Sequence, residues 1–347
     1  MKNKRLIYLL IAVIFVWLIV VTSLLLTKTD NNNNNEINNF VVSGFSTDFT
    51  KVVDKNKSSI VSIEQDGKVS TGFIYSKNKE SLYVVSSLHA INEDNSVDIF
   101  LNNGEKLKGT VVDSNAQIDI ALIECSCKFE VLPVTFGDSK LLNDGEFVLA
   151  IGTNGSLKYD FSTAFGIVSS KYREIENKIT YKDVTYDYYL SVIQLGGDFT
   201  NGYSGSPIFN MNGEVVGLIT MKDGGVTLAT TVNEAKLVIE KMISDNKCHR
   251  LDFGISGKFI NELENYEAAS LNISVDVPSG YIISDIRQNS LAYNMGLAKG
   301  DIVVSINDKE IIDLDSLLSI MYSEEKSYTF NIIRNNEKIV FTGFIND

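Results

Sequence analysis

Residues 59–65 read SIVSIEQ, a short run in which the β-branched residues Ile60, Val61 and Ile63 lie between polar ends. Short β-branched runs bounded by turn residues are typical of strands. Similar runs follow along the chain, and many short strands at close spacing predict an all-β barrel or sandwich. The further runs are residues 71–76, 82–86, 97–101, 109–113, 118–123, 147–151, 162–170, 188–194, 206–209 and 214–220.

The strand series ends at residues 233–243, NEAKLVIEKMI, where apolar side chains recur at helical spacing. We therefore predict a mostly β domain over residues 51–245 that a helix closes. The whole chain has 347 residues, a length that suggests about two domains. Its 31 Lys and Arg residues against 44 Asp and Glu residues give a net charge of −13, which argues against nucleic acid as a partner.

The N-terminal residues 6–26 contain no charged side chain, and about 20 apolar residues are enough for one helix to cross a bilayer. Lys2, Lys4 and Arg5 precede this segment, so the positive-inside rule keeps the N-terminus in the cytoplasm and places the rest outside. A cleavable signal peptide is the competing interpretation, although its apolar core is usually about 7–15 residues long. We predict a cytoplasmic flank and a single-pass cell-membrane anchor over residues 1–28.

The next segment, residues 29–50, includes five consecutive asparagines at residues 31–35. Such a polar run cannot bury enough apolar area to offset chain entropy. We therefore predict a flexible linker over residues 29–50.

The three cysteines are Cys125, Cys127 and Cys248, an odd number that cannot pair fully within one chain. Cys125 and Cys127 would suit a metal ion only with two further ligands, and the sequence offers no such cluster. We expect thiols, no metal site and no organic cofactor.

Only two histidines are present, so a mechanism that needs an imidazole base has little choice. His89 follows the apolar run LYVVSS, where a strand gives way to a loop. Taken alone, it is better explained as a structural or surface residue. His249 lies between the two predicted domains, where we expect it to be exposed.

The sequence of residues 201–207 is NGYSGSP, which places Ser204 between two glycines. Glycine permits the unusual dihedral angles of a sharp turn that lifts a hydroxyl clear of the backbone. The backbone amides of Gly202 and Ser204 are candidates for an oxyanion hole. A simple Gly-Ser hairpin turn is the alternative interpretation.

Asp119 lies in the apolar run QIDIALI, and we predict that it is part of a strand. A buried carboxylate needs a partner, and fixing the tautomer of a catalytic imidazole is one use for it. The chain order His89, Asp119, Ser204 differs from the order in α/β-hydrolases. It is the order found in the double-β-barrel serine proteases.

Residues 58–243 resemble the trypsin-like protease domain of the HtrA family of serine proteases. The matching motifs are TGFI at 71–74, LHAI at 88–91, DIAL at 119–122, FGDS at 136–139, GEFVLAIG at 145–152, GIVS at 166–169, IQ at 193–194, GYSGSP at 202–207 and NGEVVG at 212–217. The resemblance implies two six-stranded β-barrels with a triad of His89, Asp119 and Ser204 in the cleft between them.

The chain departs from the family pattern in the loops that shape the substrate pocket. Tyr203 and Ser206 replace the usual Asn and Gly, and residues 221–225 and 228–232 also differ from the pattern. The resemblance places Asp198, Phe199 and Thr220 at the pocket. Phe199 would favour a small apolar P1 side chain, whereas Asp198 would favour Lys or Arg.

Residues 246–347 resemble a PDZ domain. Phe253, Gly254 and Ile255 match the loop that binds a carboxylate, and residues 296–307 match a characteristic turn and strand. Residues 312–322 carry a stripe of apolar residues that suits a groove helix, with Leu314 expected in the groove and Leu317 in the core. Such a domain binds an extended C-terminus as an added strand.

The function implied is that of a membrane-anchored serine endopeptidase that cleaves misfolded or specific extracytoplasmic proteins, with peptide ligands on its PDZ domain. HtrA relatives commonly form trimers through aromatic residues before the first barrel, a role open to Phe40, Phe45 and Phe49. One alternative is a processing protease of narrow specificity for glutamyl or basic residues. Another is a catalytically silent, membrane-tethered PDZ scaffold.

Overall fold

The structure is a computed structural model that describes residues 17, 18, 22, 42–91, 96–181, 184–245, 250–263 and 277–345. It separates into two compact units, Met1–Thr47 and Asp48–Asp347. Nearly all of the predicted anchor, the asparagine run, Phe40, Cys248 and His249 lie outside the described residues. Among the residues that are described, no helix has the length and apolar character needed to span a bilayer.

Helix α2 spans Val42–Asn56 and therefore begins inside the segment that was predicted as a linker. Its last turns pack on the protein, because Val52 is buried and Asn56 Nδ2 donates a hydrogen bond to the carbonyl of Gly213 at 3.2 Å. The ring of Phe49 packs on Phe147, with 6.2 Å between the ring centroids.

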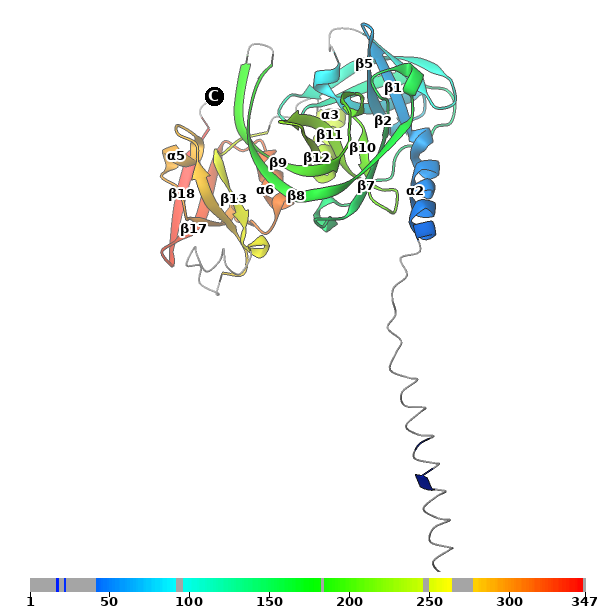
Figure 1. The fold of residues 1–347 in the computed structure, drawn as a ribbon. Coiled ribbons are helices and arrows are strands. Elements are labelled where there is room, and N and C mark those ends of the chain that lie inside the picture. Colours follow the sequence, from blue (N-terminus) through cyan, green and yellow to red (C-terminus); the bar gives the residue numbers. More distant parts are fainter. Residues whose placement is uncertain are drawn as a thin grey trace, which may run out of the picture. The chain divides into compact units, whose positions relative to one another are not determined.

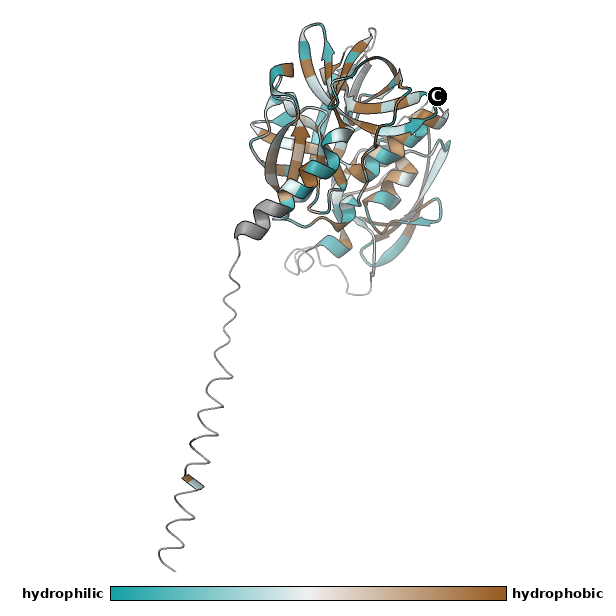
Figure 2. Ribbon diagram, turned by 90° about the vertical axis from the view of Figure 1, so that its right-hand side faces the viewer, coloured by the Kyte–Doolittle hydropathy of each residue, from teal (hydrophilic) through white to brown (hydrophobic). Residues whose placement is uncertain are grey.

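The first six strands close into a barrel in the order β1-β2-β3-β6-β5-β4. Its interior is a compact apolar core that includes Val61, Ile63, Val84 and Ile123. Hydrophobic and hydrophilic residues are interspersed along the ribbon, as the brown and teal bands of Figure 2 show, and in β4 buried and partly buried residues alternate. The strands are β1 Ile60–Gln65, β2 Lys68–Asn78, β3 Ser81–Ser87, β4 Val97–Leu101, β5 Lys106–Asn115 and β6 Ile120–Ser126.

A second closed barrel follows, in the order β10-β11-β12-β9-β8-β7, and the two barrels confirm the expected architecture. Its strands are β7 Phe147–Gly152, β8 Ser162–Tyr181, β9 Val184–Gly197, β10 Pro207–Phe209, β11 Val215–Asp223 and β12 Val226–Thr231. Helix α3, Val232–Asp245, follows β12 directly.

Two features of the second barrel differ from the prediction. Residues 228–232 were expected in a loop, but residues 226–231 form β12, which pairs with both β11 and β9. The strands β8 and β9 are also much longer than predicted, because they continue as a hairpin that extends beyond the rest of the barrel in Figure 1. That extension carries mixed polar residues, so it lacks the apolar run that reveals a strand.

The C-terminal domain is built on a sheet in the order β13-β14-β15-β17-β18, with β16 paired to β15. Phe253, Tyr328 and Phe330 pack edge to face at its centre. Its elements are β13 Ile255–Phe259, β14 Tyr281–Ile286, α5 Leu291–Met295, β15 Ile302–Ile306, β16 Lys309–Glu310, α6 Leu314–Met321, β17 Ser327–Arg334 and β18 Glu337–Phe344.

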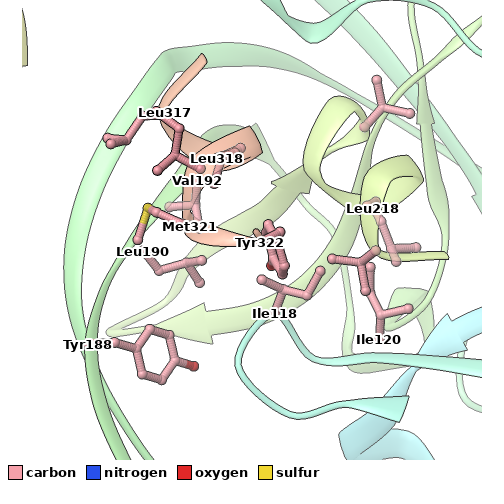
Figure 3. Close-up of a cluster of buried hydrophobic side chains, with 14 of the residues drawn as sticks. Ile118, Ile120, Tyr188, Leu190, Val192, Leu218, Leu317, Leu318, Met321 and Tyr322 are labelled. Carbon is pink, nitrogen blue, oxygen red and sulfur yellow. The ribbon is translucent and has the colours of Figure 1, made fainter. Parts of the chain in front are cut away.

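The apolar stripe of α6 belongs to a core that the two domains share. Figure 3 shows Leu317, Leu318 and Met321 of α6 beside Leu190 and Val192 of β9. As expected, Leu317 is buried, whereas Leu314 is only partly buried. Much of the predicted groove stripe therefore joins the C-terminal domain to the second barrel.

A buried ion pair lies at the same junction. Arg250 Nε lies 3.2 Å from Glu234 Oε1 of α3, and both side chains are at most 3% exposed. The hydroxyl of Tyr322 donates to the same carboxylate oxygen at 3.0 Å, and Arg250 Nη1 donates to the carbonyl of Tyr189 at 2.6 Å. These contacts join α3, β9 and the residue after α6.

We predict that Glu234→Ala lowers the free energy of unfolding by about 3–5 kcal/mol, because it leaves the Arg250 charge buried without its partner. Denaturant unfolding of the full chain measures this loss. The control is Lys236→Ala on the same helix, which removes a half-exposed pair with Glu240 (3.9 Å) and is expected to cost less than about 1 kcal/mol. Equal losses in the two variants would contradict the assigned role of the buried pair.

Candidate active site

His89 lies in a single 3₁₀ turn, η2 Leu88–Ala90, directly after strand β3. The turn aims its ring at Asp119, and Nδ1 lies 2.6 Å from Asp119 Oδ2. The backbone amide of His89 also donates to Asp119 Oδ1 at 2.8 Å. Since a carboxylate only accepts, Nδ1 carries the ring proton and Nε2 is left as an acceptor.

Asp119 lies in the turn that precedes β6, so the prediction that it is part of a strand was wrong. Its φ angle is +57°, in the left-handed region that Asp tolerates better than most residues. This conformation separates Asp119 from the alternation of the following strand, so its carboxylate meets His89 rather than the interior of the barrel. The side chain of Asp119 is 9% exposed, against 49% for His89.

Ser204 follows a 3₁₀ turn, η5 Asn201–Tyr203, and precedes β10 of the second barrel. Its Oγ lies 3.1 Å from His89 Nε2, so the hydroxyl can donate to the unprotonated nitrogen. The loop is attached to the first barrel, because the amide of Thr71 donates to the carbonyl of Ser204 at 3.1 Å and Thr71 Oγ1 donates to that of Gly202 at 2.9 Å.

Gly205 is required by this attachment. Its φ is +84°, and a Cβ atom there would lie only 2.1 Å from the carbonyl oxygen of Thr71. Any larger residue would push the serine loop away from the first barrel. The structure thus brings together all three residues that the sequence placed at the centre of the site.

The pKa of His89 is raised from its ordinary value of 6.5, mainly by the hydrogen bond to Asp119, although partial burial of the ring acts against it. Burial raises the pKa of the Asp119 carboxyl, and the hydrogen bonds from His89 oppose that effect. The His89 imidazole therefore takes up a proton more readily than an ordinary histidine does.

The two amides expected to bind an oxyanion are not both available in this conformation. The amide of Ser204 donates to the carbonyl of Asn201 at 3.2 Å, within η5. Gly202 is packed closely against the preceding loop, since a Cβ on it would lie 2.0 Å from the amide nitrogen of Gly155. Rotation of the peptide between Asn201 and Gly202 would release the Ser204 amide.

A cleft of about 1000 Å³ opens at the three residues, and both barrels contribute to its walls. Of the predicted pocket residues, Thr220 lines the cleft but Asp198 and Phe199 do not. Phe199 is 1% exposed and packs against Tyr203, with 6.3 Å between the ring centroids, whereas Asp198 is exposed. Phe199 thus belongs to the core of the second barrel.

The two departures from the family pattern are both buried. Tyr203 fills the core beside Phe199, so its ring points away from the cleft. The hydroxyl of Ser206 is also buried and makes no hydrogen bond among the described residues. Neither side chain obstructs Ser204.

Cys125 and Cys127 are free, buried thiols. Burial raises the pKa of Cys125 to about 12, so it remains a protonated thiol at neutral pH.

The predicted carboxylate loop, Phe253 to Ile255, turns into strand β13 at the edge of its sheet. Gly254 has φ +75°, and Phe253 is fully buried. Beyond this loop, a feature that the sequence did not reveal contacts the edge strand: Glu174 Oε2 of β8 accepts hydrogen bonds from the amide of Gly257 at 2.8 Å and from Ser256 Oγ at 2.9 Å. The predicted strand ended at residue 170, and a strand of the length of β8 would have included Glu174.

Comparisons with known proteins agree with this arrangement. Residues 70–218 match the family model of the trypsin-like peptidase domain, and residues 282–334 match that of the PDZ domain. "Serine protease Do-like HtrA" of Lactobacillus helveticus is 27% identical over 288 residues, which are 79% of this chain and 68% of that protein. "Serine protease HtrA-like" of Staphylococcus epidermidis is 25% identical over 304 residues, or 85% of this chain, but this chain spans only 51% of its length.

Solved structures share the fold. "HtrA-type protease AlgW with tripeptide" superposes with a TM-score of 0.58 at 20% identity, covering 85% of this chain and 96% of that chain. The same type of protease with a decapeptide gives a TM-score of 0.54 at 17% identity, over 85% of this chain and 97% of that one. These matches show a chain that joins a trypsin-like peptidase domain to a PDZ domain and is similar to the HtrA-type serine proteases, which makes it a serine-type endopeptidase.

Proposed function

We propose that the chain cleaves peptide bonds with Ser204 as nucleophile, His89 as general base and Asp119 as the group that orients the imidazole. The observation that carries this proposal is the continuous hydrogen-bonded path of 2.6 Å and 3.1 Å from Asp119 through His89 to Ser204. The first link lies within the first barrel, and the second joins it to the second barrel.

In the proposed reaction, Ser204 Oγ attacks the substrate carbonyl while Nε2 of His89 takes its proton. Asp119 stabilises the imidazolium that forms, and His89 then returns the proton to the leaving amine. Water repeats the sequence on the acyl-enzyme and releases the second product. The amides of Gly202 and Ser204 bind the oxyanion once the Asn201–Gly202 peptide has rotated.

We also propose a location in the cell membrane and a class of substrate. The uncharged residues 6–26 serve as the membrane anchor, with residues 1–5 in the cytoplasm and both domains outside. The substrates are misfolded or specific extracytoplasmic proteins, and the C-terminal domain binds their C-termini or unfolded segments. A trimer through aromatic residues near α2 remains part of the proposal, although Phe49 also packs on Phe147 of its own chain.

A catalytically silent PDZ scaffold is the second candidate, and the bond between the Ser204 amide and the carbonyl of Asn201 favours it. Turnover of an unfolded protein decides between the two functions, because a scaffold leaves the substrate intact. A narrow-specificity processing protease is the alternative within the enzyme class. Neither of the predicted pocket residues, Asp198 and Phe199, lines the cleft, so the preferred P1 residue has to be measured. A profile in which nearly all cleaved bonds follow one type of residue identifies the processing protease.

We predict that Ser204→Ala reduces cleavage of an unfolded casein by at least about 1000-fold, since the nucleophile is lost. Thermal unfolding should be nearly unchanged, because the hydroxyl makes no contact that the fold depends on. The matched control is Ser162→Ala, a partly exposed serine whose hydroxyl donates to the carbonyl of Tyr159. Undiminished cleavage by the Ser204 variant would reject the assignment.

The pH dependence should follow His89. A general base must be neutral, and the hydrogen bond to Asp119 keeps His89 protonated to a higher pH than an ordinary histidine. We predict that kcat/KM rises with pH through a limb above 6.5. In Asp119→Asn the limb should move to lower pH, and kcat should fall about 10⁴-fold. A limb that stays in place would show that another group titrates.

The contact of Glu174 with β13 allows a test of the proposed peptide-binding site at that strand. A ligand that adds a strand to β13 must displace the Glu174 carboxylate from the amide of Gly257. We therefore expect Glu174→Ala to tighten the binding of a fluorescent peptide with an apolar C-terminus by about threefold to tenfold, as measured by anisotropy. Glu146→Ala, whose carboxylate contacts Asn143, is the charge-matched control. Weaker binding by the Glu174 variant would place the ligand elsewhere.

A further inference from the structure

We propose that Gln117 is a positioning residue for the reaction: its side-chain amide fastens the turn that carries Asp119 to the backbone of Arg250, where the chain enters the C-terminal domain. The inference rests on the proposed role of Asp119. Gln117 lines the cleft, and its side chain is hydrogen-bonded to Arg250 rather than to His89 or Ser204 among the described residues, so we assign its effect to the turn.

The contact is reciprocal. Gln117 Nε2 donates to the carbonyl of Arg250 at 3.0 Å, and the amide of Arg250 donates to Gln117 Oε1 at 3.0 Å. Gln117 is 6% exposed, so little water competes for these bonds. The amide group thus pairs with a backbone unit as a neighbouring strand would, across 133 positions of sequence.

The turn needs such support because of its own geometry. Asp119 has φ +57°, and a left-handed conformation costs a residue other than glycine about 1–2 kcal/mol. Within the turn, Asn115 Oδ1 accepts from the amides of Gln117 and Ile118 at 3.0 and 3.2 Å. From the second barrel, Thr230 Oγ1 donates to the carbonyl of Ile118 at 3.1 Å, and the hydroxyl of Tyr188 donates to that of Gln117.

Arg250, to which the turn is bonded, is itself held in place by buried contacts. Its guanidinium is buried against Glu234 at 3.2 Å and donates to the carbonyl of Tyr189 at 2.6 Å. The turn that belongs to the first barrel is therefore held by the second barrel and by the first residue described after α3. A shift of the C-terminal domain at Arg250 is transmitted to the catalytic carboxylate through one side chain.

The test measures the position of Asp119 through His89. The chain contains only two histidines, so His249→Gln assigns the His89 signal in a ¹H–¹³C NMR titration of the full chain. The titratable groups around the turn are Tyr188, Glu234 and Arg250, and the proposed variants change none of them. The variants are Gln117→Ala and Gln117→Met; the second keeps the shape of the side chain without its hydrogen bonds.

We expect both variants to lower the NMR pKa of His89 toward 6.5, because the hydrogen bond to Asp119 loosens. On a chromogenic peptide substrate, kcat should fall about 10- to 100-fold while KM changes less than about threefold. The control is Gln194→Ala, which removes an amide oxygen that accepts from Arg173 Nε at 3.1 Å.

An unchanged His89 pKa in a folded Gln117→Met variant, with kcat equal to that of the control, would overturn the proposal. A loss of thermal stability with no change in His89 would likewise assign Gln117 a structural role only. If the wild type titrates His89 as stated but cleaves no substrate, the proposed function fails, and the NMR comparison still decides the role of Gln117.

Discussion

The hydrogen bond between His89 and Asp119, together with its continuation to Ser204, is the contact on which the site depends. His89 follows β3 and Asp119 precedes β6, at the end of one closed barrel where Ser87 pairs with Ile120, and Ser204 comes from the other barrel. The pairing of β3 with β6 holds His89 beside Asp119. The position of Ser204 relative to them depends on hydrogen bonds between the barrels, above all those of the Thr71 hydroxyl and amide with the carbonyls of Gly202 and Ser204.

Much of this fold follows from pattern. Buried strands such as β1 and β7 carry enough β-branched residues to be recognised, and turns separate them. Two elements could not be found in this way. The extended part of the β8–β9 hairpin has no apolar run, and Val226–Thr231 is rich in threonine, so its burial depends on partners in β9 and β11 that no local window contains.

The candidate site, like the fold, was predicted only in part. Residue types and their order along the chain identified His89, Asp119 and Ser204 as partners, because few imidazoles and buried acids were available. The local conformation of Asp119 was missed, since a left-handed residue before an apolar strand has the same sequence pattern as a strand residue. Phe199 was misplaced for a related reason: its burial against Tyr203 comes from packing, which spacing does not record. The hydrogen bonds of Gln117 and Glu174 could not be predicted from the sequence, because their partners lie far along the chain.

The C-terminal domain is more than an appended module in this structure. The stripe of α6 packs on β9, Arg250 is buried against α3, and the edge of β13 meets the carboxylate of Glu174. These contacts reach β9, α3 and β8, and β8 also lines the cleft through residues 175–178.

Labelling with a fluorophosphonate tests the central claim most directly, because this reagent modifies a serine only when a neighbouring base and an anion-binding site activate it. The account predicts one adduct, mapped by tandem mass spectrometry to Ser204, and its loss in His89→Ala. An adduct on a different residue, or a protein that degrades casein without any adduct, would contradict the account.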